Sequence, residues 1–470
     1  MICFKRLTAA CLILVFLVTS NAGAISIPDE QKLGKQFMKM IRDRGLILQD
    51  PVARHMINTV GEHIVAVLPP QPFRYDFNLI DDGSFNAFAS PAANIFVHRG
   101  LIATLETMDE FAGVMAHEVA HAASRHVSQS IDRSKMVAVG SLAGMLAGIL
   151  LGSASDGEAG SAVTLGAMAA GQSSMLAFTR ENETEADQKA ILFLEKTGYR
   201  PQGLLSGLNK IRESDYQGIE SIPDYFKTHP GTGSRIAHIA GILADYRPPA
   251  GKPAPPENYD YQMVRYRIIG LYGDPDAHLN KVKQKLRESP DDPALNYGMG
   301  LLYARTHKLD LGIAHLQKAL NILVFEPMVL LELGRLNLRK GDYDTALSVL
   351  KGITQDKVMG DTATYYAAVA QIETGDLPGA QAALTRVLER NKTGFARANY
   401  HLANIMSQQQ NAPMSHYYLG IYYAEIRDLK NALRHFGRAV DTLEDNKTKE
   451  DAQKRLQELR DGAPKQKARS

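Results

Sequence analysis

The chain contains almost no cysteine. Cys3 and Cys11 are the only cysteines among its 470 residues. Both lie in residues 1–24, which have the features of a signal peptide: a basic start, an apolar run over residues 7–18 and an Ala-Gly-Ala sequence that ends at residue 24. We expect cleavage there to release an exported protein without disulfides, whose stability depends on packed cores. A bacterial periplasm fits this pattern best, with secretion as the alternative.

The chain also lacks an excess of charge of either sign. It has 53 basic and 51 acidic residues, and the expected signal peptide removes two basic and no acidic residues, which leaves 51 of each. Proteins that bind nucleic acid depend on positive charge to neutralise phosphates. The balance therefore predicts that nucleic acid is not a partner.

A proline-rich segment separates two regions of different composition. Five prolines fall within residues 248–256, and because proline cannot continue a helix, such a segment favours a stiff, extended linker. We therefore predict a first domain over residues 25–245, a linker over 246–258, a second domain over 259–460 and a basic tail over 461–470.

The second domain repeats with a period of 34 residues. Small residues recur at this interval in two positions of the repeat: Gly300, Gly334 and Ala368 in one, and Gly312, Ala346 and Ala380 in the other. A further unit places Gly420 and Ala432 in the same pattern, but the step from Ala380 to Ala432 is 52 residues, which indicates an insertion around residues 407–414. This pattern is typical of tetratricopeptide (TPR) helix pairs, and a generic helical bundle is the alternative.

The first domain contains the sequence His-Glu-Val-Ala-His at residues 117–121. On a helix, His117 and His121 lie on one face and can share a metal ion, while Glu118 can reach a water molecule on that ion. Further along, Glu183 and Asp187 have the same helical spacing. Glu183 would be the third ligand, and Asp187 could fix the tautomer of a ligand histidine through a hydrogen bond. His126 would lie about 140° round a continuous helix from His121 and is not expected to be a ligand.

These motifs, together with Thr-His-Pro at residues 228–230 and the arginine at 235, resemble the zinc metallopeptidases related to CAAX prenyl protease and HtpX. The resemblance implies a mainly α fold: an α+β zincin-type metallopeptidase domain, with helices plus a small sheet, followed by an all-α TPR solenoid. It also implies one Zn²⁺ per subunit, a general base at Glu118, and His229 as a fourth ligand that keeps the enzyme latent. Arg235 would position substrate or stabilise the oxyanion.

The same resemblance concerns the segment over residues 86–100. In that family a strand edge here pairs with an extended substrate, which makes Asn86 and Ala87 candidates for the substrate edge; an ordinary core hairpin is the alternative. The usual form has two glycines after the proline, whereas this chain has Ala92-Ala93-Asn94. Because asparagine tolerates positive φ better than alanine, we expect Asn94 to carry the turn.

Between the two motifs lies a glycine-rich region over residues 136–178. Its first 20 residues carry no charge, and small residues recur at every fourth position in both of its halves, which predicts two closely packed helices. We expect a soluble or membrane-surface hairpin with peripheral membrane contact, because the second half carries several polar residues. Insertion in a membrane is the alternative.

The sequence thus favours a periplasmic zinc endopeptidase of the HExxH, gluzincin-like type. The resemblance and the domain order imply a role in quality control and assembly of outer-membrane β-barrel proteins. The TPR domain would dock unfolded or stalled outer-membrane proteins, or the assembly machinery, and a chaperone activity is also implied. The main alternative is a TPR chaperone or adaptor with a latent or structural zinc site; a third is an HExxH sequence that binds no metal.

Overall fold

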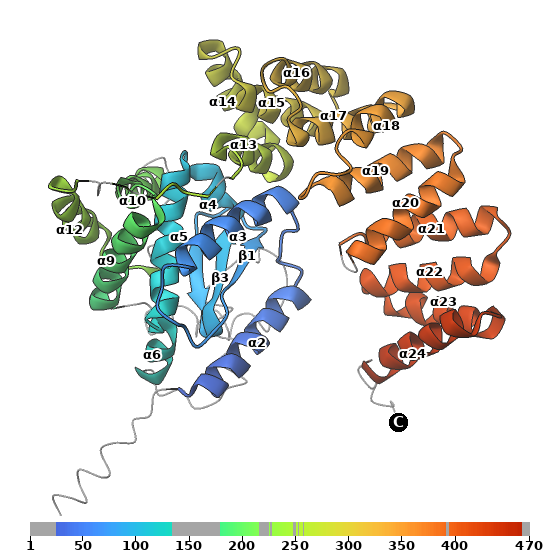
Figure 1. Cartoon of the computed structure of the whole chain (residues 1–470), viewed down its shortest axis with the longest axis horizontal. Helices are drawn as coiled ribbons and strands as arrows, with labels where there is room; N and C mark the ends of the chain where they lie inside the picture. Colours follow the sequence, from blue (N-terminus) through green and yellow to red (C-terminus); the bar gives the residue numbers. More distant parts are fainter. Residues whose placement is uncertain are drawn as a thin grey trace, which may run out of the picture. The chain divides into compact units, whose positions relative to one another are not determined.

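The computed structural model describes residues 25–133, 179–215, 225, 228–247, 251, 253–256, 258–391 and 394–462. The expected signal peptide, the glycine-rich region 136–178 and residues 463–470 of the tail lie outside this part of the chain. The structure divides into two compact units, Met1–Gly273 and Asp274–Ser470 (Figure 1). None of the helices formed by the described residues has the length and apolar character needed to cross a bilayer.

The first unit combines helices with one small sheet. Its elements are α2 (Ile27–Asp43), α3 (Pro51–Val65), β1 (Asp76–Ile80), β2 (Ala87–Ser90), the 3₁₀ turn η1 (Pro91–Ala93), β3 (Asn94–His98), α4 (Arg99–Thr104), α5 (Met108–Ala123), α6 (His126–Arg133), α9 (Arg180–Thr197), α10 (Gln202–Asp215), α12 (Thr232–Ala244) and α13 (Tyr261–Tyr272). The strand order is β1-β3-β2, with β3 parallel to β1 and antiparallel to β2, so β2 is an edge strand.

Helix α5 lies at the centre of this unit, between the sheet and the helices α9 and α10 (Figure 1). Every residue from Glu110 to His121 is buried, which is typical of a helix enclosed on all sides. Both α5 and α9 begin with a capping box, Thr107 with Glu110 and Thr179 with Asn182, which satisfies backbone N–H groups of the first turn. The capping boxes therefore stabilise the first turns of the two helices that carry the predicted site residues.

The turn between β2 and β3 differs from the prediction. Asn94 has φ −83°, whereas the positive φ angles fall on Ala92 and Ala93, at 61° and 57°. The expectation that Asn94 adopts the left-handed conformation was wrong. Its side chain instead stabilises the turn: Asn94 Nδ2 donates a hydrogen bond of 2.8 Å to the carbonyl of Pro91. The left-handed backbone is fixed from outside the turn, where the Glu30 carboxylate of α2 accepts a hydrogen bond from the Ala92 N–H.

The first unit extends beyond the proline-rich segment. Helix α13 lies within the region that the sequence assigned to the second domain, from residue 259 onward, but its contacts group it with the first unit, which reaches Gly273. Arg267 of α13 forms a buried ion pair with Asp50, at 2.8 Å. The Tyr261 hydroxyl donates to the carbonyl of Ile102 at 3.1 Å. These two interactions attach α13 to the peptide segments around α3 and α4.

The second unit consists of helices alone among its described residues. They are α14 (Pro275–Glu288), α15 (Pro293–Arg305), α16 (Leu309–Ile322), α17 (Pro327–Lys340), α18 (Tyr343–Lys351), α19 (Gly360–Glu373), α20 (Leu377–Arg390), α21 (Ala396–Gln408), α22 (Ala412–Glu425), α23 (Leu429–Thr442) and α24 (Asn446–Gly462). Successive helices pack in pairs, as predicted for a TPR solenoid.

The small residues of the repeat lie where paired helices touch. A Cβ atom at Gly334 would lie 2.5 Å from Leu350 Cγ, and one at Gly420 would lie 2.6 Å from the Phe436 ring. The extra length before Ala432 is a complete helix, α21, between α20 and α22. The predicted fold class, a mainly α chain with a small sheet in the first domain and an all-α TPR solenoid after it, is confirmed.

Candidate metal centre

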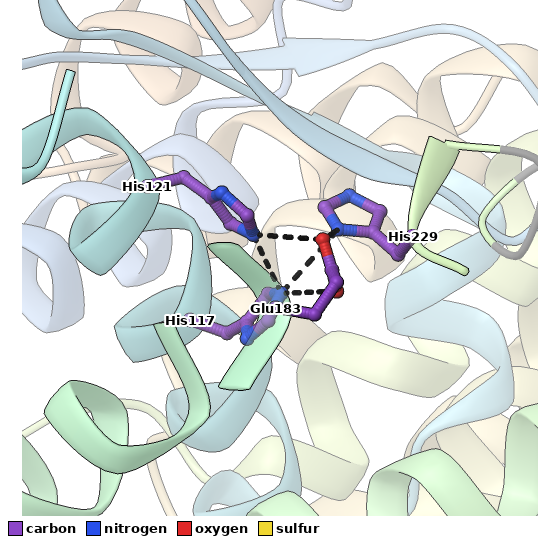
Figure 2. A group of neighbouring side chains, drawn as sticks. All are labelled: His117, His121, Glu183 and His229. Atoms are coloured by element: carbon purple, nitrogen blue, oxygen red, sulfur yellow. Dashed lines mark hydrogen bonds and ion pairs between the residues drawn. The ribbon is translucent and has the colours of Figure 1, made fainter. Parts of the chain in front are cut away.

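Three separate segments of the first unit bring the predicted site residues together. Helix α5 carries His117, Glu118 and His121, and α9, which packs against it, carries Glu183. His229 lies in the segment just before α12. Figure 2 shows the three histidines and Glu183 pointing toward one another.

The four side chains form a compact, buried group. One ligand atom from each of His117, His121, Glu183 and His229 can be chosen so that all lie within 4.8 Å of one another. The Nε2 atoms of His117 and His121 are 3.0 Å apart, and His229 Nδ1 is 3.1 Å from Glu183 Oε1. Ring nitrogens this close repel each other unless a proton or a metal ion lies between them. Imidazole nitrogen and carboxylate oxygen are donors that bind divalent transition metals in proteins, so the residues fit a metal ion.

Two further residues, Asp187 and Arg235, contact side chains of this group. Asp187 Oδ1 lies 2.9 Å from His117 Nδ1, the nitrogen that faces away from the group. The Arg235 guanidinium, which is 4% exposed, contacts both carboxylates: Glu183 at 2.6 Å and Asp187 at 2.7 Å. Burial raises the pKa of Asp187, but hydrogen bonds from Arg235 and His117 outweigh it and lower that pKa to about 2. The arrangement orients His117 and Glu183, and the expected action of Arg235 on substrate stays a prediction.

The two histidines of α5 have different electrostatic surroundings. Burial and the charge of Arg235 lower the pKa of His117, but hydrogen bonds to Asp187 and Glu183 raise it to about 9. Burial lowers the pKa of His121 well below its ordinary value. The carboxylates therefore favour a positive charge at His117, which either a proton or a metal ion can supply.

Glu118 is the acidic residue that the group leaves unbonded. Both of its carboxylate oxygens are buried and have no hydrogen-bond partner among the described residues, and His229 Nε2 lies 3.6 Å from Oε1. Burial is the main cause that raises the pKa of Glu118. A carboxylate with a raised pKa beside a metal centre is suited to accept a proton from water.

The predicted substrate edge, Asn86 and Ala87, lies at the beginning of the edge strand β2, which packs against α5. Both residues are almost fully buried, at 2% and 0% exposure. The Asn86 carbonyl accepts a hydrogen bond from the N–H of His98 on β3. Because backbone groups alternate in direction along a strand, those of Ala87 face away from β3, on the side of β2 that has no partner strand among the described residues. The role of both residues in substrate binding stays a prediction.

Sequence reasoning missed two aromatic neighbours of the group. The Tyr225 ring stacks on the His229 ring, with centroids 4.4 Å apart and planes 21° apart. His126 Nδ1 lies 2.9 Å from His121 Nδ1. The expectation for His126 assumed one continuous helix, whereas α5 ends at Ala123 and Arg125 has φ 54°. This break turns the chain so that His126 returns to His121, and no residue type in the sequence signals it.

The sequence of this region matches a known peptidase family. Residues 52–243 match the model of Peptidase family M48. The chain is 29% identical over 296 residues to the Beta-barrel assembly-enhancing protease of Yersinia pestis, which covers 62% of this chain and 60% of that protein. It is 28% identical over 298 residues to the protein of the same name from Escherichia coli K12, covering 62% and 59%. It is 25% identical over 211 residues to the Mitochondrial metalloendopeptidase OMA1 of Schizosaccharomyces pombe, covering 45% and 59%.

The chain thus spans 59–60% of the length of these relatives. The matched region contains all the residues of the buried group and Glu118. The chain therefore carries a domain of peptidase family M48, followed by a TPR solenoid.

Proposed function

We propose that this protein is a zinc-dependent endopeptidase. The observation that carries the proposal is the buried group of His117, His121, Glu183 and His229 beside the unbonded carboxylate of Glu118, in a domain of peptidase family M48. Zinc, when bound, polarises a scissile carbonyl and acidifies water. Glu118 accepts the proton of the attacking water and delivers it to the leaving amine. Asp187 and Arg235 keep His117 and Glu183 in the orientation that the site needs.

His229 regulates the access of water to this centre. A catalytic zinc site has three protein ligands and one open position, whereas four protein donors converge here. We therefore assign His117, His121 and Glu183 as the permanent ligands and His229 as the latch, which must move away before water and substrate bind. Stacking on Tyr225 supports the closed position of the latch.

The substrates that we propose are unfolded or stalled outer-membrane β-barrel proteins in the periplasm. The support is the name of the bacterial relatives, Beta-barrel assembly-enhancing protease, together with the expected signal peptide. An extended substrate would pair, through the backbone groups of Ala87, with the side of β2 that has no partner strand among the described residues. The TPR solenoid would dock either the substrate or the outer-membrane assembly machinery, which leaves the first unit free for cleavage or chaperone work.

One observation favours a second candidate, a TPR chaperone or adaptor with a structural zinc site. Four protein donors are the usual number for structural zinc, and the closed group supplies four. In that case zinc would stabilise the first unit, and the TPR solenoid would perform the cellular function.

The variant Glu118→Gln separates the two candidates. Glutamine has the same shape as glutamate but cannot accept a proton, so the endopeptidase hypothesis predicts wild-type zinc content without cleavage of an unfolded β-barrel protein. Zinc content is measured by atomic emission, and cleavage by gel electrophoresis. If the variant lacks cleavage but maintains the outer membrane as well as the wild type does, the adaptor candidate is correct. Wild-type protein that binds no zinc would contradict both candidates.

A further inference from the structure

The break between α5 and α6 places a second histidine pair beside the candidate metal centre. His126 is fully buried, and its Nδ1 atom lies 2.9 Å from His121 Nδ1. His121 presents its other ring nitrogen, Nε2, to His117 and Glu183, at 3.0 and 3.3 Å. His126 therefore contacts the nitrogen of His121 that faces away from the group, as Asp187 does for His117.

The hydrogen bonds around His126 have a consistent direction. His126 Nε2 lies 3.4 Å from Glu185 Oε2, and because a carboxylate only accepts, His126 must donate from Nε2. In a neutral imidazole the other nitrogen, Nδ1, is then an acceptor, and it accepts the N–H of His121 Nδ1. A proton on His121 Nδ1 leaves the lone pair of Nε2 directed at the group. The chain Glu185–His126–His121 thus selects the tautomer of His121 that can bind a metal ion.

Further contacts hold the residues of this hydrogen-bond series in place. The Glu185 carboxylate accepts hydrogen bonds from Lys189 Nζ, at 2.6 Å, and Ser124 Oγ, at 3.1 Å. The backbone break is held by Arg125, whose side chain forms an ion pair of 2.6 Å with Glu30 and donates to the carbonyl of Ile25 at 2.8 Å. Since Glu30 is itself buried, α2 holds the turn that directs His126 to His121.

We propose that His126, oriented by Glu185, is a positioning residue that fixes the tautomer and ring orientation of His121 toward the metal ion. This inference rests on the proposed zinc-dependent function. It gives the two histidines of α5 separate supports: the carboxylate of Asp187 for His117, and the neutral imidazole of His126 for His121. Partners of this kind typically change metal affinity by about 10–100-fold when they are removed.

The experiment measures zinc affinity of the full chain by competition with a chromophoric chelator. His126→Phe keeps a planar ring but removes the acceptor, and we expect about 10–100-fold weaker zinc binding. His126→Asn places an amide oxygen near the position of Nδ1, so it should retain most of the affinity. His126→Gln places its amide near Nε2 instead and should resemble the phenylalanine variant. The absorption spectrum of the Co²⁺-substituted protein should change in the phenylalanine and glutamine variants but not in the asparagine variant.

A matched control is His98→Phe on β3, which removes another buried imidazole and its hydrogen bond with Ser84 Oγ. Its zinc affinity should equal that of the wild type. Circular dichroism and thermal unfolding of the metal-free proteins show whether each variant folds. If His126→Phe does not fold, the comparison of the asparagine and glutamine variants decides.

The outcomes separate this inference from the proposed function. Wild-type protein that binds zinc and cleaves substrate, with equal zinc affinity in the phenylalanine, asparagine and glutamine variants, would overturn the role of His126 alone. Wild-type protein that binds no zinc would overturn the proposed function, and this inference with it. Loss of affinity in the phenylalanine and glutamine variants and rescue by asparagine would establish His126 as a positioning residue.

Discussion

The variant Arg235→Met tests how the buried carboxylates of the metal centre are stabilised. Arg235 is the cation that contacts both Glu183 and Asp187 in the first unit, at 2.6 and 2.7 Å, and both carboxylates are fully buried. Methionine retains the apolar length of the side chain but removes the charge. In the metal-free protein, Arg235→Met leaves two adjacent acidic groups whose ion-pair partners among the described residues are all histidines.

The structure sets the size of the expected effect. The pKa of Asp187 falls from 3.8 to about 2 in the folded protein, through Arg235 and His117 despite burial, and a shift of this size corresponds to about 2 kcal/mol of stabilisation. Glu183 loses its arginine partner as well and keeps its histidine partners. Removal of one member of a buried ion pair typically costs about 3–5 kcal/mol. We therefore expect the free energy of unfolding of the metal-free protein to fall by about 3–5 kcal/mol at neutral pH.

The assay is urea unfolding of the metal-free protein, followed by circular dichroism. Arg200→Met is the control, because Arg200 is 80% exposed and lies 3.9 Å from Asp109, and such a surface pair contributes at most about 1 kcal/mol. Because the folded pKa of Asp187 is lowered, its stabilising effect is complete above pH 3.8 and is lost as the pH falls to about 2. The difference between wild type and Arg235→Met should shrink over that range. A loss at neutral pH no larger than that of Arg200→Met would refute the reasoning.

Three further variants test other parts of the structure. His229→Ala should raise basal proteolysis of an unfolded substrate, because the latch is removed; unchanged or lower activity with zinc retained would contradict the latch. Ala92→Gly should raise the free energy of unfolding by about 0.5–1 kcal/mol, since Ala92 has φ 61°, and urea unfolding that shows a loss would indicate that the turn is not strained. Arg267→Met should destabilise the first unit by about 3–5 kcal/mol, because it leaves Asp50 buried without its cation. Limited proteolysis should then cleave near residue 260 faster than in the wild type, and an unchanged rate would show that α13 is held by other contacts.

Spacing along the sequence indicated which residues of the candidate site share a helix face. His117 and His121, and likewise Glu183 and Asp187, share a helix face because residues four apart lie one turn apart. The structure places each pair on a helix and brings the two helices together. The packing of α5 against α9 then brings Asp187 Oδ1 to 2.9 Å from His117 Nδ1, the kind of contact expected for Asp187. The repeat of small residues in the second domain likewise identified helix pairs, because only a small side chain fits where the pairs touch.

Predictions that depended on the path of the backbone were less reliable. Asn94 was expected to adopt the left-handed conformation in the turn after β2, but Ala92 and Ala93 have the positive φ angles. Residue preference favoured asparagine, whereas contacts with Glu30 from α2 decided the conformation. The extent of the first unit also depends on contacts that are distant in the sequence, since the buried pair of Arg267 with Asp50 holds α13.

The sequence by itself therefore pointed to the side chains that the structure groups at the candidate metal centre, the helices that carry His117, His121 and Glu183, and the repeating helix pairs of the second domain. These features depend on spacing within a single helix or repeat, which the order of residues specifies directly. Only the tertiary structure decided that Arg235 contacts both carboxylates, that Tyr225 stacks on His229, and that His126 lies against His121. Each of these contacts requires either a break in the backbone or the meeting of separate segments, and packing of the whole unit determines both.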